Sequence, residues 1–112
     1  MMNLKVDLID NFLIVKILGD LDHHSCEEIR NRLDKEIMIK NPKNLVFNME
    51  SLNFMDSSGI GVIIGRYKKI VLSGGKVGIV NIKPQVKRIY DICGLNKIIP
   101  LYIDIKQAMK SM

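Results

Sequence analysis

The spacing of apolar residues changes repeatedly along the chain, and this alternation most constrains what the chain can fold into. Residues 3–9 alternate apolar and polar side chains, and residues 12–18 form an apolar, β-branched run after the turn residues Asp10 and Asn11. From about residue 23 to 40, apolar residues recur at every third or fourth position, which is typical of an amphipathic helix. An antiparallel hairpin followed by a helix therefore opens the predicted fold.

The same change of period repeats towards the C-terminus. Further strands are predicted at residues 45–49, 76–81 and 98–103, and further helices at 57–73, 84–93 and 104–112. We interpret residues 51–55 as a loop. The order β-β-α-β-α-β-α-β-α is typical of an α/β domain with a mixed, mostly parallel sheet and right-handed crossovers. With 112 residues, the chain has the size of a single domain, which we expect to span residues 1–112.

Composition excludes several functional classes. Hydrophobic residues make up 47% and charged residues 26%, and no stretch approaches the length of a membrane span, so we expect a cytoplasmic protein without membrane contact. Aromatic residues make up only 5% and Trp is absent, which leaves little surface for stacking bases, so direct nucleic acid binding is not expected. The two cysteines, Cys26 and Cys93, are predicted to be buried, reduced thiols.

The segment from Asp56 to Gly59 carries the most chemistry. It follows a predicted parallel strand and opens a helix, and functional groups gather at such strand ends. In one interpretation, Asp56 or a serine only caps the helix. In the other, an exposed serine is phosphorylated and gains about 1.5 to 2 negative charges. A helix N-terminus tolerates this charge, whereas the neighbouring Asp56 repels it, so the modification would disturb a docking surface.

Three glycines lie in and after this segment, at positions 59, 61 and 65. Their spacing does not match a dinucleotide-binding fingerprint, and no phosphate-binding P-loop motif is present, so a nucleotide site has weak support. Glycine inside a helix costs about 0.5–1 kcal/mol relative to Ala. We therefore interpret Gly61 and Gly65 as positions where the helix closely approaches the sheet or a partner.

A second polar cluster contains Asp20, Asp22, His23 and His24. It lacks any recognised metal-ligand spacing, so we assign no metal and favour capping of the next helix by Asp22, or partner contact. A hydrolytic triad of Ser57, His24 and Asp56 has no nucleophile-elbow motif, and Asp56 is adjacent to the serine instead of positioned to orient the histidine. The residues therefore predict no catalytic group and no cofactor.

Three motifs resemble those of the anti-anti-sigma factors of the STAS domain family, and the resemblance covers nearly the whole chain. The most specific is the run FMDSSGIGVIIGRYK at residues 54–68. The second is GDLDHH at 19–24, although the family commonly has Glu where Asp20 stands. The third combines Pro84, VKR at 86–88, GL at 94–95 and KII at 97–99. The paired histidines and the GRYK segment favour the sporulation branch of the family.

This resemblance implies a mixed sheet with helices mainly on one face, and a protein–protein switch instead of an enzyme. The unmodified protein is expected to bind an anti-sigma factor that is also a serine kinase, and so to free a sigma factor. The kinase is expected to phosphorylate Ser57, the first of the two serines, and a serine phosphatase to reset it. The residues expected to line the docking face are Asp22, His24, Asp56, Ser57, Ser58, Gly59, Gly61 and Arg66.

Two alternatives stay open on the sequence alone. One is a STAS regulator in another partner-switching route, such as general stress signalling. The other is a small nucleotide-binding or hydrolytic protein that uses the segment 56–65.

Overall fold

The structure is a computed structural model that describes residues 3–112. The elements follow in the order β1 (Leu4–Ile9), β2 (Phe12–Ile17), β3 (Gly19–Leu21), α1 (Cys26–Lys40), β4 (Asn44–Asn48), β5 (Leu52–Met55), α2 (Ser57–Leu72), β6 (Val77–Val80), α3 (Pro84–Ile92), the 3₁₀ turn η1 (Leu95–Lys97), β7 (Leu101–Tyr102) and α4 (Ile105–Ser111).

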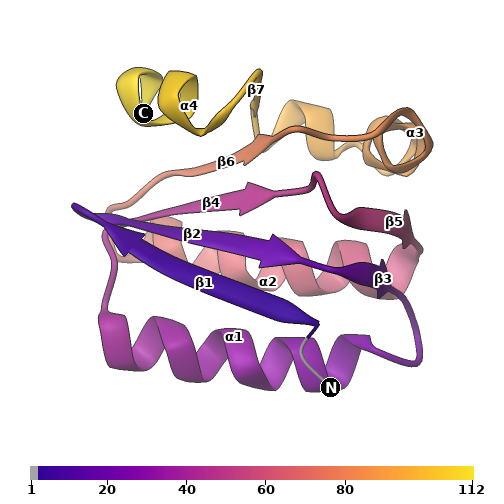
Figure 1. The fold of residues 1–112 in the computed structure, drawn as a ribbon, viewed down its shortest axis with the longest axis horizontal. Coiled ribbons are helices and arrows are strands. Elements are labelled where there is room, and N and C mark those ends of the chain that lie inside the picture. Colours follow the sequence, from indigo (N-terminus) through magenta and orange to yellow (C-terminus); the bar gives the residue numbers. More distant parts are fainter. Residues whose placement is uncertain (1–2) are drawn as a thin grey trace.

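The main sheet has the strand order β1-β2-β4-β6-β7. Strands β1 and β2 form the predicted antiparallel hairpin, with Leu4 opposite Ile17, and the remaining pairs in this sheet are parallel. The predicted α/β fold with a mixed sheet is therefore confirmed (Figure 1). Because the parallel strands run in one direction, their carboxyl ends meet at one edge of the molecule.

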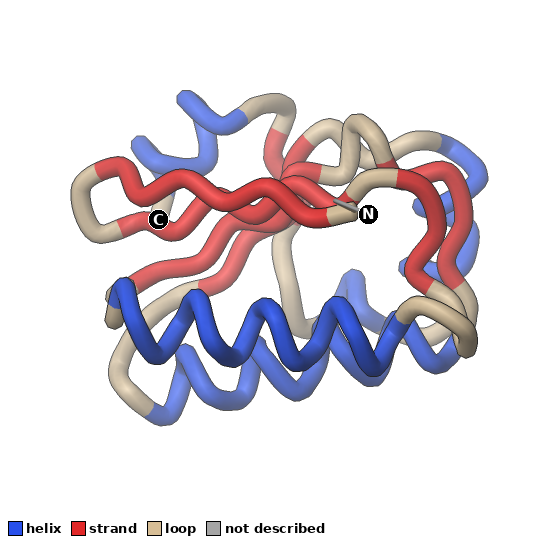
Figure 2. Tube along the Cα trace, turned by 60° about the horizontal axis from the view of Figure 1, so that its bottom comes forward, coloured by secondary structure: helices blue, strands red, loops and turns tan. Residues whose placement is uncertain are grey.

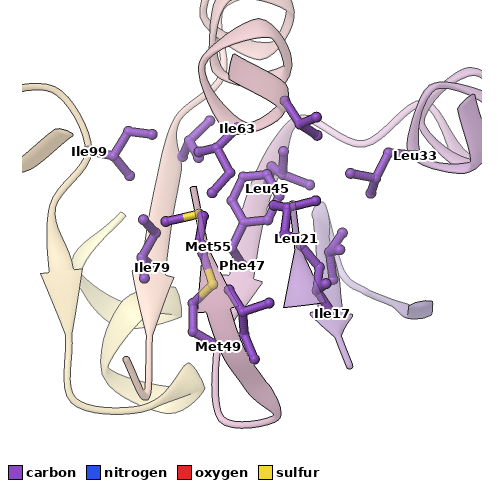
Figure 3. Close-up of a cluster of buried hydrophobic side chains, with 14 of the residues drawn as sticks. Ile17, Leu21, Leu33, Leu45, Phe47, Met49, Met55, Ile63, Ile79 and Ile99 are labelled. Atoms are coloured by element: carbon purple, nitrogen blue, oxygen red, sulfur yellow. The ribbon is translucent and has the colours of Figure 1, made fainter. Parts of the chain in front are cut away.

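The two long helices, α1 and α2, lie along one face of the sheet (Figures 1 and 2). Side chains from the sheet and these helices meet in a single apolar cluster around Phe47, which is fully buried (Figure 3). Helix α4 covers the opposite face, where Ala108 packs with Ile14, Val46 and Val80. The prediction that helices lie mainly on one face is thus confirmed, and one short helix covers the other.

Two short strands were not predicted. Strands β3 and β5 pair in parallel as a separate two-stranded sheet, with Leu21 opposite Met55. The prediction that residues 51–55 form a loop is therefore wrong, because β5 covers Leu52–Met55. Strands of three and four residues are too short to show a period of two, and only their pairing across the chain defines them.

Other local predictions are also corrected. Helix α1 begins at Cys26 with Ser25 as its N-cap residue, so the prediction that Asp22 caps it is wrong. Strand β7 is shorter than predicted because residues 98–100 form a turn after η1. The prediction of two buried thiols is wrong as well, because Cys26 is half-buried and Cys93 is exposed at the end of α3.

The hydroxyl of Tyr90 connects α3 to the segment before β7. It donates a hydrogen bond of 2.6 Å to the carbonyl oxygen of Ile99 inside the core. Burial and the neighbouring Asp91 charge raise the pKa of Tyr90 above its ordinary value of 10.0. The neutral phenol is therefore the form that stabilises the folded protein.

We predict that Tyr90→Phe lowers the free energy of unfolding by about 1–3 kcal/mol at pH 7, because the Ile99 carbonyl loses its buried partner. A raised pKa in the folded state means that the contribution of Tyr90 is complete below pH 10 and is lost as pH rises through the folded-state pKa. The gap between the two proteins should therefore narrow above pH 10. Urea denaturation at pH 7 and at about 10.5 measures this, and equal stabilities at pH 7 would contradict it.

Candidate functional site

The two-stranded sheet of β3 and β5 brings two loops side by side at one end of the molecule (Figure 1). Because its strands are parallel, the loop after β3 and the start of α2 after β5 leave the sheet at the same edge. The first loop carries Asp22, His23 and His24, and the second carries Asp56 and Ser57. Two motifs that are more than 30 residues apart in sequence thus form one surface.

The carboxylate of Asp56 holds these two loops together. Its Oδ1 accepts hydrogen bonds from the backbone N–H groups of Ser58, at 2.9 Å, and Gly59, at 3.2 Å, so of the expected caps, Asp56 or a serine, it is Asp56 that caps α2. Its Oδ2 accepts from the N–H of His23 at 3.1 Å, across the gap between the loops. Asp56 is therefore a clamp within the protein, and both of its oxygens already have partners.

Asp22 shapes the first loop instead of capping α1. Its Oδ1 accepts from the N–H groups of His24, at 2.9 Å, and Ser25, at 3.0 Å. The hydrogen bond from Ser25 is the main reason that the pKa of the Asp22 carboxyl lies below its usual range. The turn leaves both neighbouring histidines exposed, with ring centroids 5.7 Å apart.

Ser57 stands at the first position of α2 with an exposed side chain, whereas Ser58 is half-buried. No hydrogen bond of the Ser57 hydroxyl is found among the described residues, and none joins it to His24. The Asp56 oxygens are bound to backbone N–H groups. The hydrolytic triad of Ser57, His24 and Asp56 is therefore not assembled in residues 3–112. Ser57 thus presents an exposed hydroxyl at the N-terminus of α2.

Gly59 lies where α2 presses against the end of β3. A Cβ at this position would overlap the Leu21 carbonyl oxygen and would lie 2.7 Å from Cγ of Met55. Only glycine fits this contact without movement of the backbone. The packing that joins the two loops therefore requires Gly59, in addition to the hydrogen bonds of Asp56.

Gly61 and Gly65 have a different setting. A Cβ added at either position would meet nothing within 4 Å, so the interpretation that they let the helix approach the sheet is wrong. Gly61 is exposed on the outer face of α2, one turn after the serines. The open space at these positions leaves the other interpretation, that the glycines let the helix approach a partner closely.

Arg66 lies apart from the other predicted site residues. It is only 8% exposed and points between α1 and α2, where its Nε is 3.2 Å from Oδ1 of Asp34. Burial lowers the pKa of Arg66, while the Asp34 charge opposes this shift. Lys69 also pairs with Asp34, at 3.1 Å. At 1.5 Å per residue, Arg66 is about 13 Å along the helix from Ser57, so its place in the structure is between the helices and not on the exposed surface.

Within residues 3–112, no group of three or more His, Cys, Asp or Glu side chains is arranged to hold a metal ion. No helix in this part of the chain is long and apolar enough to cross a membrane.

The chain is similar to known proteins over nearly its whole length. The STAS domain model matches residues 3–108. The chain is 41% identical to an anti-sigma F factor antagonist of Paenibacillus polymyxa over 99% of this chain and 97% of that protein. It is 30% identical to an anti-sigma-B factor antagonist of Bacillus subtilis over 89% of this chain and 92% of that protein. The solved structure of the anti-sigma factor antagonist SpoIIAA in its unphosphorylated form has a TM-score of 0.81, with 26% identity over 96% of this chain and 94% of that one.

We predict that Asp56→Ala destabilises the protein by about 1–3 kcal/mol, because α2 loses its cap and His23 loses its acceptor. Amide hydrogen exchange should accelerate at Ser58, Gly59 and His23 together. Asp56→Asn, which keeps one acceptor oxygen, serves as the control and should lose less. Exchange at His23 that is unaffected by Asp56→Ala would show that the two loops are not coupled through this carboxylate.

Proposed function

The chain belongs to the STAS domain family, and from this premise we propose that it is an anti-sigma factor antagonist that phosphorylation of Ser57 switches off. In the unmodified state it binds an anti-sigma factor that is also a serine kinase, and the bound sigma factor is released. A serine phosphatase restores the binding form. The protein acts by binding in the cytoplasm, without a cofactor and without contact to nucleic acid.

The observation that carries this proposal is the exposed hydroxyl of Ser57 on a rigid surface. The Asp56 carboxylate fixes the loop of Asp22 and His24 beside the start of α2, so the surface around Ser57 exists before any partner arrives. A kinase can reach the hydroxyl there, and a partner that covers it is sensitive to its modification. Both properties are needed in a switch of this kind.

The surroundings of Ser57 favour repulsion over a change of fold as the effect of the phosphate. The N–H groups of Ser58 and Gly59 already donate to Asp56, and that of Ile60 donates to the Asp56 carbonyl. The phosphate therefore meets no free donor at these three positions and lies beside the Asp56 carboxylate. Its added charge stays at the surface, where it opposes docking.

The size of this effect is sufficient for a switch. Covering a phosphate with a partner that lacks a matching positive group leaves a buried, unpaired charge, which costs several kcal/mol. A loss of about 4 kcal/mol reduces affinity roughly a thousandfold. No rearrangement of the sheet or of α2 is needed.

The proposed docking surface contains Asp22, His24, Ser57, Ser58 and Gly61, with Asp56 and Gly59 holding it in shape. Arg66 contributes indirectly, through the packing of α1 on α2, because its side chain is buried. The sigma F-type route, which we associate with sporulation, is favoured by the 41% identity to the Paenibacillus protein. The general stress route is the second candidate, supported by the 30% identity to the sigma B-type antagonist.

We predict that Ser57→Asp weakens binding to the anti-sigma factor by about two to three orders of magnitude, in line with the cost of an unpaired charge at an interface. Ser57→Ala should bind like the unmodified protein and accept no phosphate. Isothermal titration calorimetry measures the affinities, and incubation with the kinase and ATP followed by mass spectrometry locates the phosphate. Ser58→Ala is the matched control and should still be phosphorylated at Ser57. Loss of binding in Ser57→Ala with retained binding in Ser57→Asp would rule out the repulsion mechanism.

A second prediction concerns Gly61. Gly61→Ala should raise the free energy of unfolding by about 0.5–1 kcal/mol, because Ala favours the helix and its methyl group meets no atom of this protein. The same methyl group should lower affinity for the anti-sigma factor about tenfold or more, because it separates the two surfaces. Urea denaturation and calorimetry on the same variant provide the two readings. A variant that is more stable and binds as tightly as the wild type would remove Gly61 from the docking surface.

A further inference from the structure

We propose that Phe54 is an apolar anchor of the docking surface, inserting into an apolar pocket of the anti-sigma factor beside Ser57. This inference rests on the function proposed above and adds a residue that neither the motifs nor the comparisons assign to binding.

The exposure of Phe54 is the first observation. Its side chain is 52% exposed, whereas Phe47 is fully buried in the core and Phe12 is half-buried. Leaving a large aromatic ring in water forgoes apolar burial that the fold gains from the other two. In strand β5 the end residues Leu52 and Met55 are buried, whereas Asn53 and Phe54 between them are exposed.

The position of Phe54 is the second observation. It lies three residues before Ser57, and three residues of extended chain span at most about 11 Å. A standard interface covers about 800 Å² on each partner, which corresponds to a disc of about 16 Å radius. A partner centred on the Ser57 hydroxyl therefore covers exposed groups at the distance of Phe54.

Strand pairing holds the backbone at Phe54. Phe54 pairs with Asp20 of β3 in the two-stranded sheet, and this sheet leads directly into the two loops that Asp56 clamps. An aromatic side chain held by a strand has only two side-chain torsions to fix on binding, which keeps the entropic cost of its insertion low. Aromatic residues, Phe among them, are enriched in the buried core of protein interfaces.

Polar residues neighbour Phe54 in the two-stranded sheet. Asp20 is exposed opposite it on β3, and Asn53 beside it accepts a hydrogen bond of 2.7 Å from Nζ of Lys83. An apolar centre with a polar rim is the usual layout of a protein interface. The matching partner surface is an apolar pocket with a polar group at its edge that can pair with Asp20.

Leu72 is an exposed apolar residue that does not have this relation to Ser57. Leu72, which is 88% exposed, is at the opposite end of α2. At 1.5 Å per residue it is about 22 Å from Ser57 along the helix, outside the expected footprint. Leu72 therefore provides a matched control: it is an exposed, large apolar residue on the same molecule.

The test measures affinity for the anti-sigma factor kinase encoded in the same genome, using unphosphorylated full-length variants and calorimetry. Phe54→Ala should weaken binding at least tenfold, Phe54→Leu should recover most of the loss, and Leu72→Ala should stay within twofold of wild type. Urea midpoints of Phe54→Ala and wild type should agree closely, because the ring is outside the core, and this separates a binding defect from a folding defect. The rate of Ser57 phosphorylation at low kinase concentration should fall in parallel with affinity.

Three results overturn the proposal in distinguishable ways. If the wild type binds and Phe54→Ala binds within twofold of it, the anchor is wrong while the proposed function stands. If the wild type does not bind the anti-sigma factor at all, the proposed function fails and the anchor fails with it. Equal losses in Phe54→Ala and Leu72→Ala would also reject the anchor, since they indicate a nonspecific apolar effect.

Discussion

The candidate site depends on the hydrogen bonds that the Asp56 carboxylate accepts. One oxygen caps α2 through Ser58 and Gly59, and the other reaches the backbone of His23 in the loop after β3. A single side chain therefore fixes both the start of a helix and the position of a distant loop relative to it. Gly59 makes this possible, because a side chain there would displace the end of β3.

This arrangement separates the groups that hold the surface from the groups that face a partner. The oxygens of Asp56 are used within the protein, while Ser57, His24 and Gly61 are left open. Such a preformed surface loses little conformational entropy on binding. It also supports the proposed phosphate switch, since a preformed surface has no easy way to move an added charge aside.

The glycines of α2 are residues of the same type to which the tertiary structure gives different roles. Gly59 is needed inside the protein, where any side chain would overlap its neighbours, whereas Gly61 and Gly65 face open space. Both glycines lower the stability of the helix without allowing a closer contact within the fold, which is why we associate Gly61 with a partner. Arg66 shows the reverse case, because a residue expected on the docking face is instead buried between two helices beside Asp34.

The sequence by itself determined the order of the main-sheet strands and the helices, the antiparallel hairpin, a cap of α2 by Asp56 or a serine, and the chemical character of the 56–59 segment. These features are local, since apolar periodicity and capping preferences act over a few residues. Only the tertiary structure decided that β3 and β5 pair, that Asp56 also holds His23, that Gly61 is bare and that Phe54 is exposed. Each of these depends on which distant segments come into contact, and neither a strand of three residues nor a single exposed ring leaves a periodic signal in the chain.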